Sequence, residues 1–394
     1  PVLRIPLVPP GDVARHKEYE DHVAELEKRI KSAATNQPPL SADLLAQWKA
    51  ELTNLKGHPP PPIPVAHGLQ EGGVPGSVYE GIHDAHIQNR GSYERLGAVV
   101  PRRFPRLLAG DHQAPITAGS GRLQLAHWIA SPDNPMTARV MVNRLWQHHF
   151  GEGIVRTANN FGKLGTPPTH PELLDYLACE FVKSGWSIKA MHRAIMLSAT
   201  YQQSSIPDAA NLRADPENQL FGRMNRQRLE AEAIRDSLLA AAGDLDLSLR
   251  GPALRELDNH RRTLYLMTIR SDRSNYRMLF DAADPVGVAE ARLNTTVAPQ
   301  ALFLLNNPFV LDQVKRLAAA AQTAGPAQDR TRIGWLYERL YGRPPKGREI
   351  AIGLQALRHA RQSAGARGQG IATALAWEAY CQVLVCANEF IYVD

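Results

Sequence analysis

Apolar residues recur at helical spacing along much of the chain, and proline- and glycine-rich stretches separate these helical runs. The apolar positions of the first run are spaced four, three and four residues apart, on one helical face: Tyr19, Val23, Leu26 and Ile30. Residues 44–55 repeat this spacing, and Pro38 and Pro39 interrupt the chain between the two runs. We therefore predict a helical hairpin over residues 12–57, acting as a packing spacer or, alternatively, as a partner-binding coiled coil.

Residues 58–119 lack helical periodicity. Four consecutive prolines, Pro59–Pro62, require an extended and stiff backbone. The remainder of this segment is rich in glycine, proline and short β-prone pieces. We expect an extended arm that lies over a neighbouring domain, with a docking peptide for a separate partner as the alternative.

The block from Gly121 to Gln203 is rich in Trp, His and Arg and predicts four helices. The first covers residues 123–129. Asn134 should cap the second, with Pro135 at its first position and Gly151 at its end. A loop rich in glycine and asparagine follows, up to Pro168.

Two more helices should complete this block. Thr169 and Glu172 have the spacing of a capping box for the third helix, and Gly185 should end it. Ser187 should cap the fourth helix.

The C-terminal half predicts further helices over residues 228–240, 300–324, 330–341, 347–362 and 372–390. Between them, residues 241–260 are expected to form a loop. Residues 263–269 alternate enough to predict a strand, with a short helix as the alternative. The fold class is therefore mainly α: a multi-helix globular domain with an N-terminal helical hairpin and an extended Pro/Gly-rich arm. We expect three parts, at residues 1–57, 58–119 and 120–394.

The composition of the 394 residues excludes several classes of protein. A hydrophobic content of 44% and a charged content of 21% are typical of a globular chain. No apolar run is long enough for a transmembrane segment. The net charge of +6 is diffuse, so we expect no nucleic-acid partner. Because the chain starts at Pro1 without a signal peptide, we expect a fragment or a processed form.

The three cysteines do not indicate a disulfide framework, and none lies in a CxxCH motif, so we expect no cofactor in this chain. We interpret them as buried apolar thiols. The sequence also lacks a GxSxG elbow, a P-loop and an HExxH motif. Catalytic residues are therefore unknown, and the candidates are histidines of the block: His148, His149, His170 and His192. A zinc site needs three or four ligands at recognisable spacing, which these do not have, so structural hydrogen bonds are the favoured interpretation.

Further polar and aromatic residues are candidates for ligand binding: Arg139, Asn143, Arg144, Trp146, Tyr201 and Arg262. Arg139 and Asn143 lie four apart, as in a polar network that tethers loops. In the alternative interpretation, Arg144 binds an anion or a sugar hydroxyl in a cleft and Trp146 provides a stacking face.

Charges of alternating sign mark a second cluster between Arg261 and Arg292, which fits ion pairs that hold an irregular segment together. Asp281 and Asp284 in this cluster are weak candidates for a cation site, since hard cations prefer carboxylate oxygens.

Three runs in the block carry a resemblance to a known family: GRLQLAHWIASPDNPMTARVMVNRLWQHHFGEGIV, THPELLDYLA and GWSIKAMHRAIMLSATYQQSS. VPRRFPRLL precedes them, and four runs follow: RLEAEAIRDSLLA, LFDAADP, TTVAPQALFLLNNPFV and NEFIYVD. Over residues 91–394 the chain resembles the planctomycete-specific C-terminal domain of unknown function, domain of unknown function 1553. This chain has Asn160-Phe161-Gly162 where relatives often have an acidic residue before Phe-Gly, and it lacks the cysteine that relatives often have near Asp284 to Arg292.

The resemblance implies a C-terminal module of a secreted, multidomain planctomycete protein, in the periplasm or at the cell surface. It implies other domains of the same parent protein as partners, including a c-type haem domain outside this chain. We expect a scaffolding or ligand-binding role. The alternatives are an enzyme acting on polysaccharide and an electron-transfer partner of the haem domain.

Overall fold

The computed structural model describes residues 2–33, 41–69, 71–73, 76–77, 80–271, 276–365 and 368–393, and it is mainly helical, as predicted. The chain forms two compact units, residues 1–134 and 135–394. No helix in the described ranges is long and apolar enough to cross a membrane. The predicted three-part division stays a prediction.

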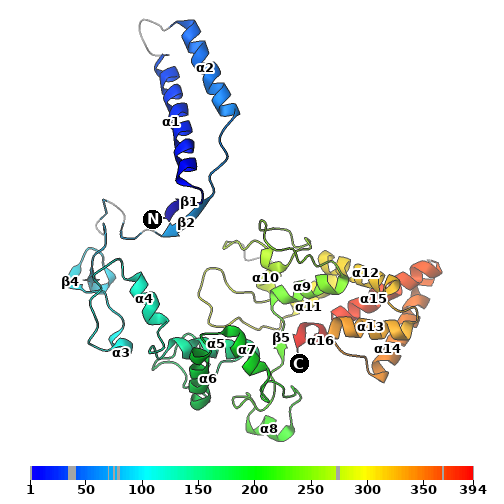
Figure 1. Ribbon diagram of the computed structural model, residues 1–394. Coiled ribbons are helices and arrows are strands. Elements are labelled where there is room, and N and C mark those ends of the chain that lie inside the picture. Colours follow the sequence, from blue (N-terminus) through cyan, green and yellow to red (C-terminus); the bar gives the residue numbers. More distant parts are fainter. Residues whose placement is uncertain are drawn as a thin grey trace. The chain divides into compact units, whose positions relative to one another are not determined.

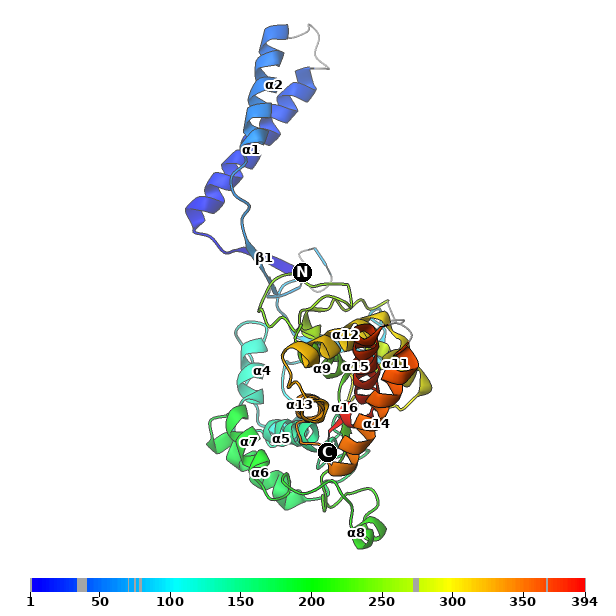
Figure 2. The ribbon, with the colours of Figure 1, turned by 90° about the vertical axis from the view of Figure 1, so that its right-hand side faces the viewer.

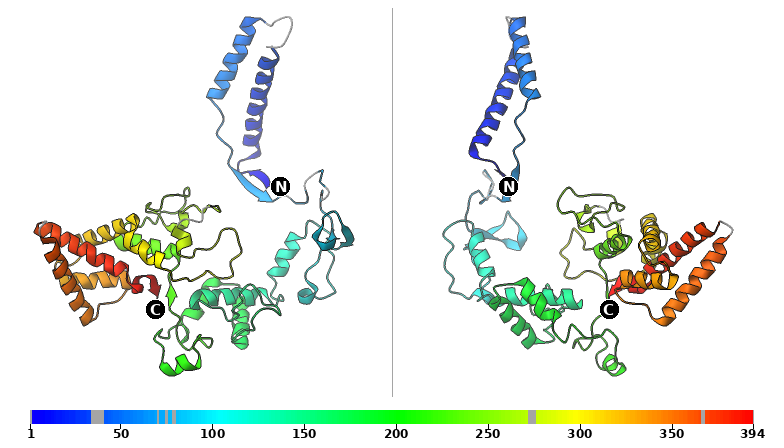
Figure 3. Two further views of the ribbon diagram at one scale, coloured as in Figure 1. Left: turned by 180° about the vertical axis from the view of Figure 1, so that it is seen from behind. Right: turned by 45° about the vertical axis from the view of Figure 1, so that its right-hand side comes forward.

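The first unit contains the predicted hairpin. Its helices α1 (Pro10–Ala33) and α2 (Ala42–Gly57) lie side by side (Figures 1 and 3). The Tyr19 hydroxyl donates to the Leu55 carbonyl at 3.1 Å, and Lys56 pairs with Glu27 at 2.6 Å. The predicted break at residues 36–39 lies outside the described residues.

Residues 58–119 form more regular structure than the sequence predicts. Strand β2 (Val65–Leu69) pairs antiparallel with β1 (Val2–Pro6) and closes the base of the hairpin. Strands β3 (Ala85–Gln88) and β4 (Leu96–Val100) form a second ladder. The helices α3 (Arg106–Ala109) and α4 (Arg122–Ile129) complete this unit.

The first half of the second unit contains three helices around one apolar cluster: α5 (Thr137–Phe150), α6 (Pro171–Lys183) and α7 (Ile188–Met196). Gly151 ends α5 in the left-handed conformation, as predicted. The Ser187 side chain accepts a hydrogen bond from the Ala190 N–H at 3.2 Å, which confirms the predicted cap of α7. Helix α8 (Ala209–Ala214) follows.

Two predicted helix starts are wrong. Helix α5 begins at Thr137, because Asn134 turns back and its side chain donates to the Trp128 carbonyl at 3.4 Å. The capping box of α6 is absent. His170 occupies the N-cap, and Thr169 instead bonds the Ile154 carbonyl through its N–H at 2.9 Å.

The larger apolar cluster of the second unit includes the buried Trp377 and Leu336 and packs the remaining helices together. These helices are α9 (Ala231–Ala242), α10 (Tyr276–Leu279), α11 (Ala298–Asn306), α12 (Pro308–Thr323), α13 (Asp329–Tyr341), α14 (Gly347–Ala364), α15 (Gln369–Val385) and α16 (Asn388–Ile391). Figure 2 shows most of these helices grouped around α15 and α13. The predicted helix over 300–324 breaks at Asn307, where Pro308 starts α12. Residues 227–228 form strand β5, which pairs with β6 (Tyr392–Val393), so the helix predicted from residue 228 begins only at Ala231.

The strand predicted over residues 263–269 is wrong. Thr263–Tyr265 forms one turn of 3-10 helix, in line with the alternative of a short helix. Arg235 of α9 holds the segment that precedes this turn. Its fully buried guanidinium donates to the Leu257 carbonyl at 2.9 Å, to the Arg261 carbonyl at 2.8 Å and to the Asn259 carbonyl. One side chain therefore satisfies backbone acceptors that a neighbouring strand would otherwise satisfy.

Candidate functional site

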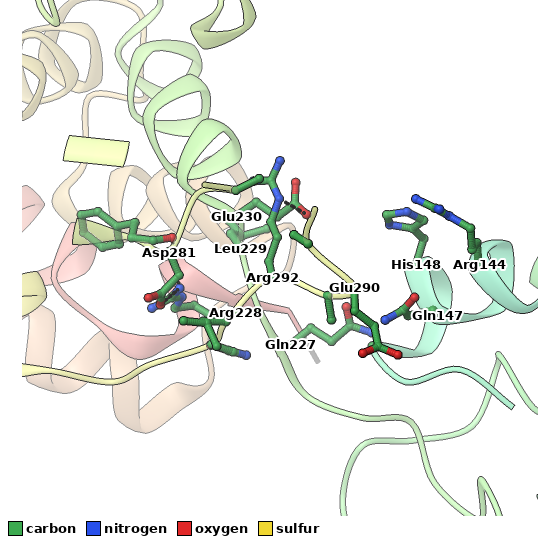
Figure 4. A pocket seen from close by; sticks show the side chains of 17 residues that line it. Arg144, Gln147, His148, Gln227, Arg228, Leu229, Glu230, Asp281, Glu290 and Arg292 are labelled. Carbon is green, nitrogen blue, oxygen red and sulfur yellow. Dashed lines mark hydrogen bonds and ion pairs between the residues drawn. The ribbon is translucent and has the colours of Figure 1, made fainter. Parts of the chain in front are cut away.

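Helix α5 has a buried face and an open face. Its buried side chains are Ala138, Val142, Asn143, Leu145, Trp146 and Phe150. Arg144, Gln147 and His148 follow one another at positions i, i+3 and i+4, so they share the opposite face. Figure 4 shows Arg144 and His148 side by side on this helix.

The C-terminal end of α5 is fixed by side chains from the segment before α9. Asn225 donates to the Phe150 carbonyl at 2.9 Å, and Gln227 donates to the His149 carbonyl at 3.1 Å. Both bonds satisfy carbonyls that have no partner within the helix. They also hold Gln227 and its neighbour Arg228 close to the open face of α5.

A buried ion pair forms the base of the opposite wall. Arg228 donates to a carboxylate oxygen of Asp281 at 2.8 Å, and the Thr295 N–H and hydroxyl donate to the same oxygen, each at 2.8 Å. Burial raises the pKa of Asp281, but the bonds from Thr295 and Arg228 outweigh it and hold this pKa below its usual value. Asp281 has a positive φ of 57°, as a residue at a sharp change of chain direction often does.

Asp281 and Thr295 thus join the two ends of a loop, residues 282–294, which lines the cavity from Ala289 to Asn294. Polar contacts hold this loop. Arg292 donates to Glu232 of α9 at 2.5 Å, and the Asn159 N–H donates to Glu290 at 2.9 Å. Beyond the buried Ala282 most of the loop is exposed, with Val288 93% and Leu293 74% accessible, so polar contacts rather than apolar packing hold this part.

The cavity between these walls has a volume of about 320 Å³ (Figure 4). Most of the charged groups that line it already have partners: Arg228 pairs with Asp281, Arg292 with Glu232, and Glu230 lies 3.4 Å from Arg292. In the part of the chain that the structure describes, Arg144, Gln147 and His148 make no side-chain hydrogen bond or ion pair. The open face of α5 therefore has the capacity to bind an added polar group.

The four candidate histidines do not converge on one cavity. Only His148 lines this one. His149 and His192 form a direct contact between α5 and α7, with Nε2 and Nδ1 2.8 Å apart, so one ring donates and the other accepts. Burial, and then His192 and His148, lower the pKa of His149. His170 lies elsewhere, with Nδ1 3.0 Å from the Thr169 hydroxyl.

The other candidates lie apart from one another. Asn143 and Trp146 are buried, and Trp146 stacks on Phe150 at 4.2 Å, so it offers no exposed stacking face. Tyr201 packs its ring against His149 at 5.3 Å, and Arg262 lies 3.6 Å from Asp236. Of the candidates for ligand binding, only Arg144 lines the cavity beside α5.

Arg139 donates to Asp175 of α6 at 2.7 Å, and this bond raises its pKa. The cation site proposed at Asp281 and Asp284 gains no support. Asp281 is occupied by Arg228 and Thr295, and Asp284 accepts from the Val286 N–H at 2.9 Å. Among the described residues no group of three His, Cys, Asp or Glu side chains is arranged to hold a metal ion.

The cysteines differ from one another. Cys381 is buried, which raises the pKa of its thiol to about 12, whereas Cys179 is exposed, so the prediction of buried thiols is wrong for Cys179.

Sequence reasoning missed most of the cavity. Gln227, Arg228, Glu230 and Glu290 line it but were not candidates, because they reach the open face of α5 from positions about 80 to 140 residues away. Nothing in their local sequence signals that approach. The RLEAEAIRDSLLA run, which begins at Arg228, carries the family resemblance but does not indicate a cavity.

The fold and this cavity define a mainly helical protein with a polar site beside one helix. The chain belongs to the PSD1 family: the family model, described as protein of unknown function (DUF1553), matches residues 121–357, more than half of the chain. The matched range includes α5 and every residue that lines the cavity. It is narrower than the resemblance over residues 91–394. No curated protein and no solved structure matches the chain.

Proposed function

We propose that this chain is a ligand-binding module that binds an acidic sugar in the cavity beside α5. The observation that carries the proposal is the set of Arg144, Gln147 and His148 on one helix face, which have no side-chain partner among the described residues, in a cavity where Arg228 and Arg292 are already paired with carboxylates. The guanidinium fork of Arg144 matches the geometry of a carboxylate, and Gln147 and His148 add hydrogen bonds. The carboxylates of Glu230 and Glu290 would accept hydrogen bonds from hydroxyl groups across the cavity.

A carbohydrate fits this lining better than an apolar ligand, since most groups that face the cavity are polar. The hydrolase alternative would require the histidines to act together, and His149, His170 and His192 lie outside the cavity. No observation favours the electron-transfer alternative. A binding role therefore has the best support.

Replacing Arg144 with alanine should raise the Kd for digalacturonate about tenfold, because one charge-assisted interaction is lost. Isothermal titration calorimetry on the purified chain measures this effect. The dimethyl ester of digalacturonate keeps the hydroxyls but not the charges, so it should bind the unmodified chain about tenfold more weakly. Arg193→Ala is the matched control, because Arg193 is exposed on α7 and lies outside the cavity.

Equal affinity for the acid and the ester would contradict the proposal, and so would equal losses in Arg144→Ala and Arg193→Ala. Release of reducing ends from polygalacturonate, abolished by His148→Ala, would show an enzyme instead of a binding module.

We further propose that the module acts in an exported multidomain protein of planctomycete type, at the periplasm or the cell surface. The support is the sequence resemblance, in which this domain follows a c-type cytochrome domain in secreted proteins. Fractionation of cells that produce the parent protein, with an antibody against residues 135–394, tests this. We expect the antigen in the periplasmic or surface fraction, and an antigen confined to the cytosol would refute the proposal.

A further inference from the structure

The loop between α5 and α6 is built around hydrogen bonds of its own. The Thr157 hydroxyl donates to the Asn160 carbonyl at 2.8 Å and accepts from the Thr166 N–H at 2.9 Å. The Asn160 side chain accepts from the Gly162 N–H at 3.0 Å. These bonds fix the Asn160-Phe161-Gly162 motif, which the cavity beside α5 does not use.

Close backbone contacts make this loop dependent on glycine. A Cβ atom at Gly165 would lie 1.9 Å from the Asn160 carbonyl oxygen, closer than any side chain permits. A Cβ atom at Gly153 would lie 2.6 Å from the Val155 carbonyl oxygen. The loop therefore has this conformation without a ligand, and binding sites of small molecules are usually preformed in this way.

This loop forms one wall of a second cavity, of about 460 Å³, whose other wall comes from α5 and α6. Its apolar lining includes Phe161, Pro168, Pro171 and Leu174. The volume lies within the range of small-molecule sites. An aromatic ring in this cavity would pack against the Phe161 ring and against the faces of Pro168 and Pro171.

Two cationic side chains and one carboxylate line the same cavity. Arg139 is bound through Nε to Asp175 at 2.7 Å and through Nη1 to the Pro135 carbonyl at 2.6 Å. Lys163 is exposed and makes no side-chain hydrogen bond or ion pair to any residue that the structure describes. Because Asp175 neutralises one of the two cations, the lining keeps a net positive charge that suits an anion.

We propose that this second cavity binds a small aromatic carboxylate, with its ring between Phe161 and the prolines and its carboxylate at Lys163. The site is separate from the cavity beside α5 and does not depend on the function proposed for that cavity. It assigns a ligand-binding role to this glycine-dependent loop.

Ligand-observed NMR titration of the full chain tests this proposal with two probes of the same shape, phenylacetate and phenylacetamide. Phenylacetate should bind with a Kd about tenfold lower than that of phenylacetamide. Lys163→Gln should raise the Kd of phenylacetate about tenfold and leave that of the amide unchanged. Since Lys163 is exposed, this substitution should not unfold the chain. Lys189→Gln, which removes an exposed lysine of α7 outside the cavity, should change neither value.

Three results would overturn the assignment. The first is an absence of phenylacetate binding, or equal binding of the acid and the amide. The second is an equal loss in Lys163→Gln and Lys189→Gln, which would indicate nonspecific attraction. The third is a loss in Arg144→Ala but not in Lys163→Gln, which would place the anion in the cavity beside α5.

Discussion

Replacing Arg235 with methionine should lower the free energy of unfolding by about 3 to 5 kcal/mol. The buried guanidinium donates to three backbone carbonyls of residues 257–261 and to the Thr263 hydroxyl at 3.1 Å, and methionine can donate to none of them. Each buried acceptor left without a partner costs about 1 to 3 kcal/mol, less what water or local rearrangement restores. Urea unfolding followed by tryptophan fluorescence measures the change.

Two further variants separate this role from simple loss of charge. Arg235→Lys keeps the charge but cannot reach three carbonyls at once, so it should also destabilise the protein, though by less. Arg193→Met removes an exposed arginine and should stay within about 0.5 kcal/mol of the unmodified protein. If Arg235→Met were as stable as Arg193→Met, the claim that Arg235 holds residues 257–263 in place would be wrong.

The second large effect is expected at Asn143, where alanine should lower the free energy of unfolding by about 2 to 4 kcal/mol. The buried side-chain amide donates to the Val155 carbonyl at 3.0 Å and accepts from the Val155 N–H at 2.8 Å. Without it, both groups of Val155 lose their partner in the interior. Thermal unfolding, with its transition followed by circular dichroism, measures the loss.

Asn143→Asp tests the directions of the two hydrogen bonds between Asn143 and Val155. The carboxylate still accepts from the Val155 N–H, but it places a negative charge against the Val155 carbonyl oxygen, so it should be at least as destabilising as alanine. Gln147→Ala, on the open face of the same helix, should change stability by no more than about 0.5 kcal/mol. An Asn143→Asp protein as stable as the unmodified one would contradict the reciprocal bonding of Asn143.

The sequence predicted the features that depend on near neighbours. The stop at Gly151, the cap at Ser187 and the helices α13 and α14 follow from local spacing and local backbone geometry. The helix predicted over residues 372–390, by contrast, ends at Val385, and α16 follows it. The failed predictions depend on hydrogen bonds that the spacing of apolar residues does not show. Thr169 does not cap α6, because its hydroxyl donates to the Ile154 carbonyl at 3.3 Å and His170 occupies the N-cap position before Pro171. Residues 263–269 alternate like a strand, but the Thr263 N–H donates to Asp236 of α9, and the backbone beyond it bonds Leu254 in an isolated bridge.

The residues of the cavity also divide into those that local spacing predicts and those that it does not. Periodicity places Arg144 opposite Trp146 on α5, so the open face of this helix could have been recognised from sequence. The opposite wall of the cavity could not have been recognised from the sequence. Arg228 and Asp281 are 53 residues apart, and no local pattern relates one to the other. Periodicity separates His148, four residues after Arg144, from its neighbour His149, but it does not show that His149 packs against α7.

A crystal structure of the chain in complex with digalacturonate tests the central claim most directly. The account predicts a carboxylate of the ligand within hydrogen-bond distance of the Arg144 guanidinium, with ligand hydroxyl groups directed at Glu230 or Glu290. A ligand bound elsewhere on the chain, or a cavity beside α5 that stays empty at saturating digalacturonate, would contradict it.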